Sequence, residues 1–176
     1  IGFDKHKRLM LFVYHPETID YKNNLENIDG ILNAINEVDF EIIMIYPNID
    51  TLSDFVIDKL EKFSIDKDHV FLVKNLDRKI YLSIMECADV MVGNSSSGIV
   101  ESPSFSIPVV NIGNRQNGRD KSENVIDCKN SYSSVLKAIN AATNDGEFKS
   151  RISNPSFVGT VTSKNEPRFE RCIAKS

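Results

Sequence analysis

The chain has 176 residues, 41% of them hydrophobic, and a formal net charge of -4, which suits a single globular domain with a sizeable core. The negative balance argues against a broad nucleic-acid surface, and no apolar run is long enough to span a membrane. Three cysteines, Cys87, Cys128 and Cys172, are far apart and show neither metal-ligand nor disulfide spacing, which favours a reducing compartment, the cytoplasm.

The first half of the chain alternates short apolar runs with amphipathic segments. It begins at Ile1, without a methionine or a signal-peptide pattern, and enters a strand almost at once, so we expect it to be a piece of a longer protein. Unbroken apolar runs predict strands buried on both faces at 9–14, 40–46, 70–73 and 89–92. Apolar residues at helical spacing predict the intervening helices, at 21–38, 52–63 and 78–88.

The second half continues this alternation less regularly. Further elements are predicted as strands at 108–112 and 124–127 and as a helix at 131–142. The helix that starts near Gly98 should be short, because Pro103 follows closely. We expect an irregular tail over about 144–176, with one last helix at 168–174. The whole pattern predicts an α/β fold, in which helices cover both faces of a parallel sheet of about six strands.

A serine-rich turn, Gly93-Asn94-Ser95-Ser96-Ser97-Gly98, follows the strand at 89–92 and leads into a helix; we call it the serine loop. Unpaired N–H groups at the start of a helix and serine hydroxyls are suitable donors to phosphate oxygens. Glu101, one turn into the helix, could accept hydrogen bonds from paired sugar hydroxyls. The same residues also suit an ordinary capped turn, and the loop alone leaves both interpretations open.

Polar side chains follow four of the predicted strands at the point where each strand ends. His15 follows the first strand and Asn48 and Asp50 follow the second. The serine loop follows the fourth strand, and Arg115 and Arg119 follow the fifth. Ligands of parallel sheets bind beyond the carboxyl ends of the strands, where these residues would meet. Two arginines suit phosphate oxygens and an imidazole can donate to phosphate or act as an acid, so the set favours a ligand site.

Each of these residues also has a purely structural interpretation. His15 could satisfy a neighbouring backbone carbonyl, and Asn48 with Asp50 could form a turn and a helix cap. Arg119 has carboxylates close by in the sequence, so a local salt bridge competes with a ligand contact. No spacing of histidine, cysteine or carboxylate residues indicates a metal site.

Five motifs taken together resemble the hydrolysing UDP-N-acetylglucosamine 2-epimerases, in particular those that feed sialic-acid and related nonulosonate pathways. In chain order they are His15-Pro16, Tyr46-Pro47-Asn48-Ile49-Asp50, the serine loop with Glu101, Asn111-Ile112-Gly113-x-Arg115-Gln116-x-Gly118-Arg119, and Glu123-Asn124-Val125. The resemblance covers about residues 9–142. The tail from Asn154 onward departs from the glycine-rich ending and final helix usual in the family, and Ser102-Pro103 also departs from the common pattern.

The resemblance implies a fold and a reaction. The family has two Rossmann-like domains in the glycosyltransferase-B arrangement with the active site between them, and this chain looks like the C-terminal domain alone. The reaction removes the proton at C2 of the sugar, expels UDP by elimination and adds water, giving free N-acetylmannosamine without a metal or redox cofactor. The carboxylates that act on the sugar ring belong to the N-terminal domain, so we expect a UDP-binding half that does not turn over.

The resemblance also implies roles for individual residues. His15 matches the catalytic histidine that reaches the phosphates and helps the sugar–phosphate bond to break. The remaining matches are to UDP-binding or cleft residues: Asn48 and Asp50 at the cleft, Ser95, Ser96, Ser97 and Gly98 at the diphosphate, Glu101 at the ribose hydroxyls, and Arg115 as a basic residue at the ligand. For Arg119, both interpretations stay open: a ligand contact and a local salt bridge.

The expected partners are therefore UDP or a UDP-N-acetylhexosamine and the N-terminal domain of the same enzyme, with neither nucleic acid nor a membrane. Oligomeric state of the whole protein and the substituents of the sugar are left open. Two other functions remain: the donor-binding domain of a glycosyltransferase with the same two-domain plan, and a non-catalytic nucleotide-sensing module. A flavodoxin-like receiver is disfavoured, because no acidic cluster follows the first strand.

Overall fold

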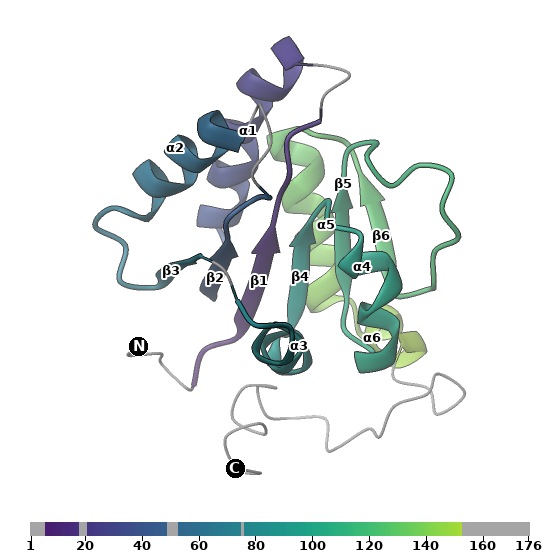
Figure 1. The fold of residues 1–176 in the computed structure, drawn as a ribbon. Helices are drawn as coiled ribbons and strands as arrows, with labels where there is room; N and C mark the ends of the chain where they lie inside the picture. The colour runs from purple at the N-terminus through teal and green to yellow at the C-terminus, as the bar shows by residue number, and fades with distance from the viewer. Residues whose placement is uncertain (1–5, 18–20, 49–52, 75, 153–176) are drawn as a thin grey trace.

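The computed structural model describes residues 6–17, 21–48, 53–74 and 76–152, and side chains within 21–26 are not described (Figure 1). Six strands form one sheet: β1 (Leu9–Val13), β2 (Glu41–Ile45), β3 (Val70–Val73), β4 (Val90–Gly93), β5 (Val109–Ile112) and β6 (Val125–Cys128). Every pairing is parallel, and the strand order is β3-β2-β1-β4-β5-β6. The predicted Rossmann-like α/β sheet is confirmed, since this is the order of the doubly wound nucleotide-binding fold.

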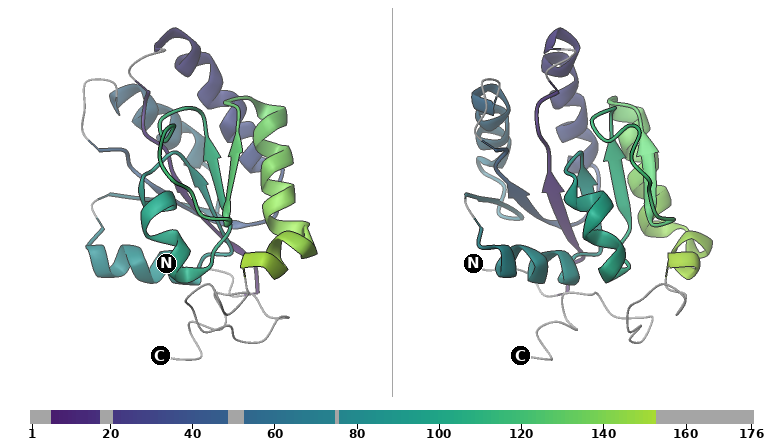
Figure 2. Two further views of the ribbon diagram at one scale, coloured as in Figure 1. Left: turned by 90° about the vertical axis from the view of Figure 1, so that its right-hand side faces the viewer. Right: turned by 45° about the vertical axis from the view of Figure 1, so that its right-hand side comes forward.

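Helices cover both faces of the sheet, as predicted. One face carries α1 (Tyr21–Asn36), α2 (Ser53–Ser64), α5 (Tyr132–Asn144) and α6 (Gly146–Ile152). The other carries α3 (Arg78–Cys87), α4 (Ser97–Val100) and the 3-10 helix η2 (Ser102–Phe105). Figure 2 shows α3 and α4 on the opposite side of the strands from α1 and α5. The expected short helix before Pro103 is confirmed, because α4 has only 4 residues.

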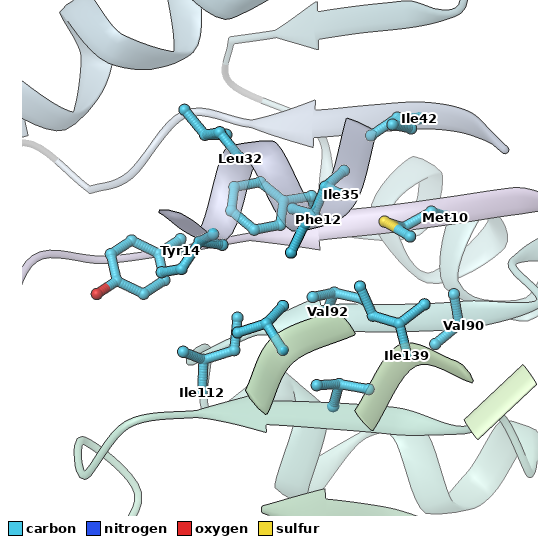
Figure 3. Close-up of a cluster of buried hydrophobic side chains, with 14 of the residues drawn as sticks. Met10, Phe12, Tyr14, Leu32, Ile35, Ile42, Val90, Val92, Ile112 and Ile139 are labelled. Carbon is cyan, nitrogen blue, oxygen red and sulfur yellow. The ribbon is translucent and has the colours of Figure 1, made fainter. Parts of the chain in front are cut away.

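Two apolar cores result from the alternation of side chains along each strand. All five residues of β1 are buried. Met10 and Phe12 point towards α1 and α5 and share one core with Ile35 of α1 and Ile139 of α5 (Figure 3). Their neighbours in β1 point the other way, into the core under α3 and η2. Side chains of a strand alternate between faces, so an unbroken apolar run is what a strand buried on both sides requires.

The end of the described chain corrects one expectation. The stretch from about 144 was expected to be irregular, but α6 occupies Gly146–Ile152. The Asp145 carboxylate accepts from the N–H groups of Glu147 at 2.9 Å and Phe148 at 3.2 Å, which caps the helix. Phe148 and Ile152, four residues apart, are both buried, so the helix is held by its apolar face. The predicted helix at 168–174 lies outside the described residues.

Two further expectations concern cysteines and membranes. Cys128 is a half-buried free thiol, whereas Cys87 takes part in a disulfide, contrary to the expectation that the cysteines form none. No helix in the part of the chain that the structure describes has the length and hydropathy to cross a membrane.

Candidate functional site

The strand order reverses between β1 and β4, and the candidate site lies where these two strands end. The chain passes from β1 outward to β2 and β3, then returns to β4 beside β1 and continues outward to β5 and β6. Such a switch point opens a crevice at the carboxyl ends of the two central strands, where ligands of these sheets bind. His15 follows β1 and the serine loop follows β4, so both emerge at the switch point.

Gly93 lets the serine loop leave the sheet against the end of β1. It is paired with Val13 and has φ of 141°, a conformation that favours glycine. A Cβ at this position would lie 1.9 Å from the carbonyl oxygen of Val13. The next N–H, that of Asn94, donates to the same oxygen at 3.1 Å. The two central strands are therefore fastened together at their carboxyl ends by a contact that only glycine fits.

The side chain of Asn94 joins the serine loop to the backbone of His15. Its Oδ1 accepts from the His15 N–H at 2.7 Å, and its Nδ2 donates to the His15 carbonyl at 2.8 Å. The amide is fully buried. Asn94 was seen in the sequence only as part of the loop, and the amide directly after a strand-ending glycine was the one local signal of this role.

The imidazole of His15 is buried and attached to the loop after β2. His15 is 8% exposed, and its Nδ1 accepts from the backbone N–H of Asn48 at 3.4 Å. A neutral imidazole that accepts at Nδ1 carries its proton on Nε2. The Ser53 hydroxyl donates to the carbonyl of Asn48, which anchors this loop to the start of α2. His15 and Asn48 thus meet as predicted, while Asp50 lies outside the described residues.

Three hydroxyls meet at the serine loop. Those of Ser95 and Ser97 lie 2.9 Å apart, and Ser97 is also hydrogen-bonded to the phenol of Tyr81 on α3. Tyr81 lies within the helix predicted over 78–88, but the sequence did not show that its hydroxyl reaches the loop. Burial raises the pKa of Tyr81, the Ser97 hydrogen bond lowers it, the charge of Glu101 raises it and the Ser95 hydroxyl lowers it, with a net rise.

The backbone donors of the serine loop differ from those expected of a helix start. The Gly98 N–H donates to the Ser95 carbonyl at 3.1 Å, so this first-turn amide is used within the loop. With 4 residues, α4 also has little macrodipole. No described residue accepts from the N–H of Ser95 or Ser96, and these two amides are the open donors. The Ser96 side chain makes no capping bond, but Oγ of Ser95 accepts from the Ser97 N–H at 3.4 Å, so the capped-turn interpretation also has support.

Gly98 holds α4 close to the sheet. A Cβ here would lie 3.0 Å from Cγ1 of Val109 and 3.6 Å from the sulfur of Met91. The buried hydroxyl of Ser102 donates to the Gly98 carbonyl at 2.6 Å and accepts from Nδ2 of Asn124 at 2.9 Å. Gly98 therefore has a packing role that exists whether or not a ligand binds.

Glu101 lies on the same side of the sheet as the hydroxyl cluster. Its Oε1 is 3.4 Å from Nη2 of Arg78, at the start of α3, and its side chain is 24% exposed compared with 74% for Arg78. Its charge acts on the Tyr81 phenol, which in turn bonds to Ser97. Glu101 is thus near the serine loop, as predicted, and the arginine beside it was not anticipated from the sequence.

The loop between β5 and β6 is hydrogen-bonded to the serine loop. Nη1 of Arg115 and Nε2 of Gln116 both donate to the carbonyl of Asn94, at 3.2 and 2.8 Å. Gln116 is 2% exposed and Arg115 is exposed. Arg119 is also exposed, and no carboxylate of a described residue lies within ion-pair distance of it. The local salt bridge considered for Arg119 is therefore absent from the described part of the chain.

Glu17 ties the same β5–β6 loop to the end of β1. Its Oε1 accepts from the backbone N–H groups of Asn114 at 3.1 Å and Arg115 at 3.3 Å. Gly113 precedes them with φ of 75°, and a Cβ there would lie 2.4 Å from that carboxylate oxygen. The loops after β1, β4 and β5 are thus tied together around the switch point. No group of histidine, cysteine and carboxylate side chains within the described ranges could hold a metal ion.

Comparison with known proteins gives one family and several relatives. The family model described as UDP-N-acetylglucosamine 2-epimerase matches residues 2–165. A Legionella pneumophila protein named UDP-N,N'-diacetylbacillosamine 2-epimerase (hydrolyzing) is 35% identical over 148 residues, which are 84% of this chain and 39% of that protein. The Escherichia coli polysialic acid biosynthesis protein P7 is 32% identical over 168 residues, covering 93% of this chain and 40% of that protein. The chain thus spans about two fifths of the length of these relatives.

Solved structures share the fold at lower identity. The S. aureus MnaA–UDP co-structure matches with a TM-score of 0.67 at 15% identity, over 96% of this chain and 44% of that one. The UDP-GlcNAc 2-epimerase of Neisseria meningitidis, bound to UDP-GlcNAc, matches with a TM-score of 0.63 at 12% identity, over 98% of this chain and 44% of that one. An E. coli heptosyltransferase, WaaC with ADP, matches with a TM-score of 0.54 at 10% identity, over 82% of this chain and 45% of that one.

Proposed function

The chain belongs to the UDP-N-acetylglucosamine 2-epimerase family, and from this premise we propose that the serine loop, His15 and Glu101 bind the UDP part of a nucleotide sugar. The observation that carries the proposal is the paired hydrogen bond between the Asn94 amide and the His15 backbone. It brings a phosphate-type loop and an imidazole together at the switch point of the sheet, where nucleotides bind in this fold.

The donors around the serine loop suit a diphosphate. The open N–H groups of Ser95 and Ser96, the serine hydroxyls and the Arg115 guanidinium are all close to the loop, and none of them carries negative charge. The proton assigned to Nε2 suits His15 to donate to a phosphate oxygen. Glu101 supplies the acceptor that a pair of ribose hydroxyls needs. We propose that Asn48 borders the same crevice.

In the whole protein we propose the hydrolysing epimerase reaction on a UDP-N-acetylhexosamine. The C2 proton is removed, the C1–O bond to UDP breaks, and water then adds a hydroxyl at C1 and a proton at C2 to give the free, epimerised sugar. Negative charge develops on the departing diphosphate, and each preorganised donor to such a charge is worth roughly 3 kcal/mol of barrier. The name of the Legionella relative, a UDP-N,N'-diacetylbacillosamine 2-epimerase, favours acetamido sugars as substrates.

We further propose that this chain binds UDP without completing the reaction, because the carboxylates that act on the sugar ring belong to a separate domain in the family. Coverage of 44% of the solved relatives is consistent with one domain of two. We also propose that the whole protein contains this second domain, is located in the cytoplasm and forms an oligomer. The heptosyltransferase match leaves a donor-binding domain of a glycosyltransferase as the competing function, and product analysis of the whole protein decides between a free sugar and a transferred one.

Titration with UDP tests the binding proposal. We expect the parent chain to bind UDP, and Glu101→Ala and Ser96→Ala each to weaken binding by about fivefold to thirtyfold, the loss of one or two net hydrogen bonds. Matched controls are Glu86→Ala and Ser150→Ala, which change exposed side chains on α3 and α6. Unchanged affinity in both site variants, by calorimetry, contradicts the assignment.

A further inference from the structure

We propose that the hydroxyl of Tyr81 is a positioning group for the serine loop: it donates to Ser97 and so directs the hydroxyl hydrogen of Ser95 outward, towards a bound diphosphate. The inference rests on the proposed function and adds to it a residue that does not itself touch the ligand. Its basis is the hydrogen-bonded series of hydroxyls from Tyr81 through Ser97 to Ser95.

The geometry fixes which groups can respond to an anion. Tyr81 comes from α3, is half-buried, and reaches the loop with its hydroxyl. Ser97 is buried at 8% exposure and stands between the phenol and Ser95. Ser95 is half-buried and next to the open backbone amides, so it is the member of the series nearest to the expected ligand.

Counting hydrogens gives the direction of the series. Three hydroxyls carry three hydrogens, and the two contacts that involve Ser97 use two. The Ser95 hydroxyl also lies near enough to the phenol to lower its pKa, so its remaining hydrogen can be directed either to the phenol oxygen or to a ligand. If Tyr81 donates to Ser97 and Ser97 donates to Ser95, the remaining hydrogen is that of Ser95. The reverse direction would leave the phenol hydrogen instead and present a lone pair to the ligand. An anion requires the first direction, and each donor in the series strengthens the next.

Other contacts favour the same direction. The Ser97 N–H donates to Oγ of Ser95 at 3.4 Å, so this oxygen already acts as an acceptor, which suits a hydroxyl that donates its own hydrogen elsewhere. The net rise in the pKa of Tyr81, led by burial and assisted by the charge of Glu101, keeps the phenol protonated and able to donate at neutral pH. The carboxylate assigned to the ribose thus also stabilises the phenol in its donor form.

A merely structural role for the Tyr81 hydroxyl would have a different signature. If it only satisfied the buried Ser97, its removal would lower stability and affect all ligands of the site alike. If it positions Ser95, its removal would weaken ligands that carry a diphosphate and spare those that lack one. Comparison of UDP with uridine therefore separates the two roles.

The test is a titration of the chain with UDP and with uridine, followed by NMR, for the parent and for Tyr81→Phe. The matched control is Tyr132→Phe, which removes the hydroxyl of a tyrosine 41% exposed on α5, on the other face of the sheet. We expect Tyr81→Phe to weaken UDP about fivefold, one net hydrogen bond, and to leave uridine within about twofold. Tyr132→Phe should change neither. In a double-mutant cycle with Ser95→Ala, the two losses should be less than additive, because the phenol acts through Ser95.

The outcomes are distinct. Equal UDP affinity of the parent and Tyr81→Phe overturns the positioning role and leaves the proposed function intact, and so does an equal loss for UDP and uridine. A parent chain that does not bind UDP overturns the proposed function and this inference with it. If Tyr81→Phe does not fold, 3-fluorotyrosine placed at position 81 is a nearly isosteric alternative with a stronger donor. It should tighten UDP binding, and an unchanged affinity overturns the inference.

Discussion

Asn94 holds the backbone of His15 at both of its polar groups, accepting from the N–H at 2.7 Å and donating to the carbonyl at 2.8 Å. The carbonyl of Asn94 in turn accepts from Arg115 and Gln116. One residue therefore connects the loops that follow β1, β4 and β5. The position of the imidazole relative to the serine loop is set by this fully buried amide rather than by contacts of the imidazole alone.

Replacing Asn94 by alanine should cost stability and binding together. The change leaves the buried N–H and carbonyl of His15 without their partner, and each orphaned group costs about 1–3 kcal/mol. We expect the free energy of unfolding in urea to fall by about 2–5 kcal/mol and UDP affinity to fall at least tenfold in the fraction that stays folded. Asn33→Ala, an exposed position of α1, is the control and should change both by little. Parent-like stability would show that the amide contact contributes nothing.

Gly93→Ala should be among the most damaging changes to the fold. Its Cβ would lie 1.9 Å from a backbone oxygen in the adjacent strand, and φ of 141° disfavours any other residue. We expect a loss of more than about 3 kcal/mol, or no soluble protein. Gly146→Ala is the control, because nothing lies within 4 Å of a Cβ added there and helix propensity favours alanine. Urea denaturation of both variants measures the difference, and equal stabilities would refute the role given to Gly93.

Local sequence patterns were sufficient for the fold and only partly for the site. All six strands were predicted within one residue of their observed bounds. For β1, β2, β4 and β5 the reason is that burial on both faces leaves a continuous apolar signal. Helical spacing likewise predicted the helix that carries Tyr81. What its hydroxyl would meet depends on a loop 16 residues further on, and spacing carries no information about that contact.

Two further contacts and one helix were not predicted, also because local patterns carry too little information. The donation of Gln116 to Asn94 spans 22 residues, and the pairing of Arg78 with Glu101 spans 23. Such contacts are made by the tertiary fold and have no local period. The seven residues of α6 were missed because two apolar side chains, Phe148 and Ile152, are too few to establish a helical pattern, and its cap at Asp145 was read as part of an irregular tail.

The chain alone should not form N-acetylmannosamine from UDP-N-acetylglucosamine. Its proposed residues stabilise the leaving diphosphate, whereas removal of the C2 proton needs a base that the family places on another domain. We expect no free sugar by NMR after prolonged incubation of the chain with the nucleotide sugar. UDP binding measured on the same preparation controls for loss of structure. Repeated turnover by this chain would contradict the proposed division of roles between domains.

Acid should selectively weaken the contacts of Asp127 on β6. Partial burial raises the pKa of this carboxyl, but hydrogen bonds from Lys121 and Asn111 and the charge of Lys121 outweigh it and hold the pKa below the usual 3.8. A carboxyl whose pKa is lower in the folded state contributes stability above the unfolded value, and this contribution is lost as the pH falls through the folded value. The window of loss therefore lies below about pH 3.8.

Asp127→Asn tests this in urea unfolding between pH 6 and pH 2.5. At pH 6 the parent should be the more stable protein, by less than about 1 kcal/mol, because the Asp127 side chain is 56% exposed and solvent screens its ion pair. The difference should shrink towards zero at the lowest pH, where the parent carboxylate becomes protonated. Asp120→Asn is the control, since its exposed carboxylate pairs with no cation among the residues described, and it should show no such trend. A stability difference between Asp127→Asn and the parent that is the same at both ends of the range would refute the assigned ion pair.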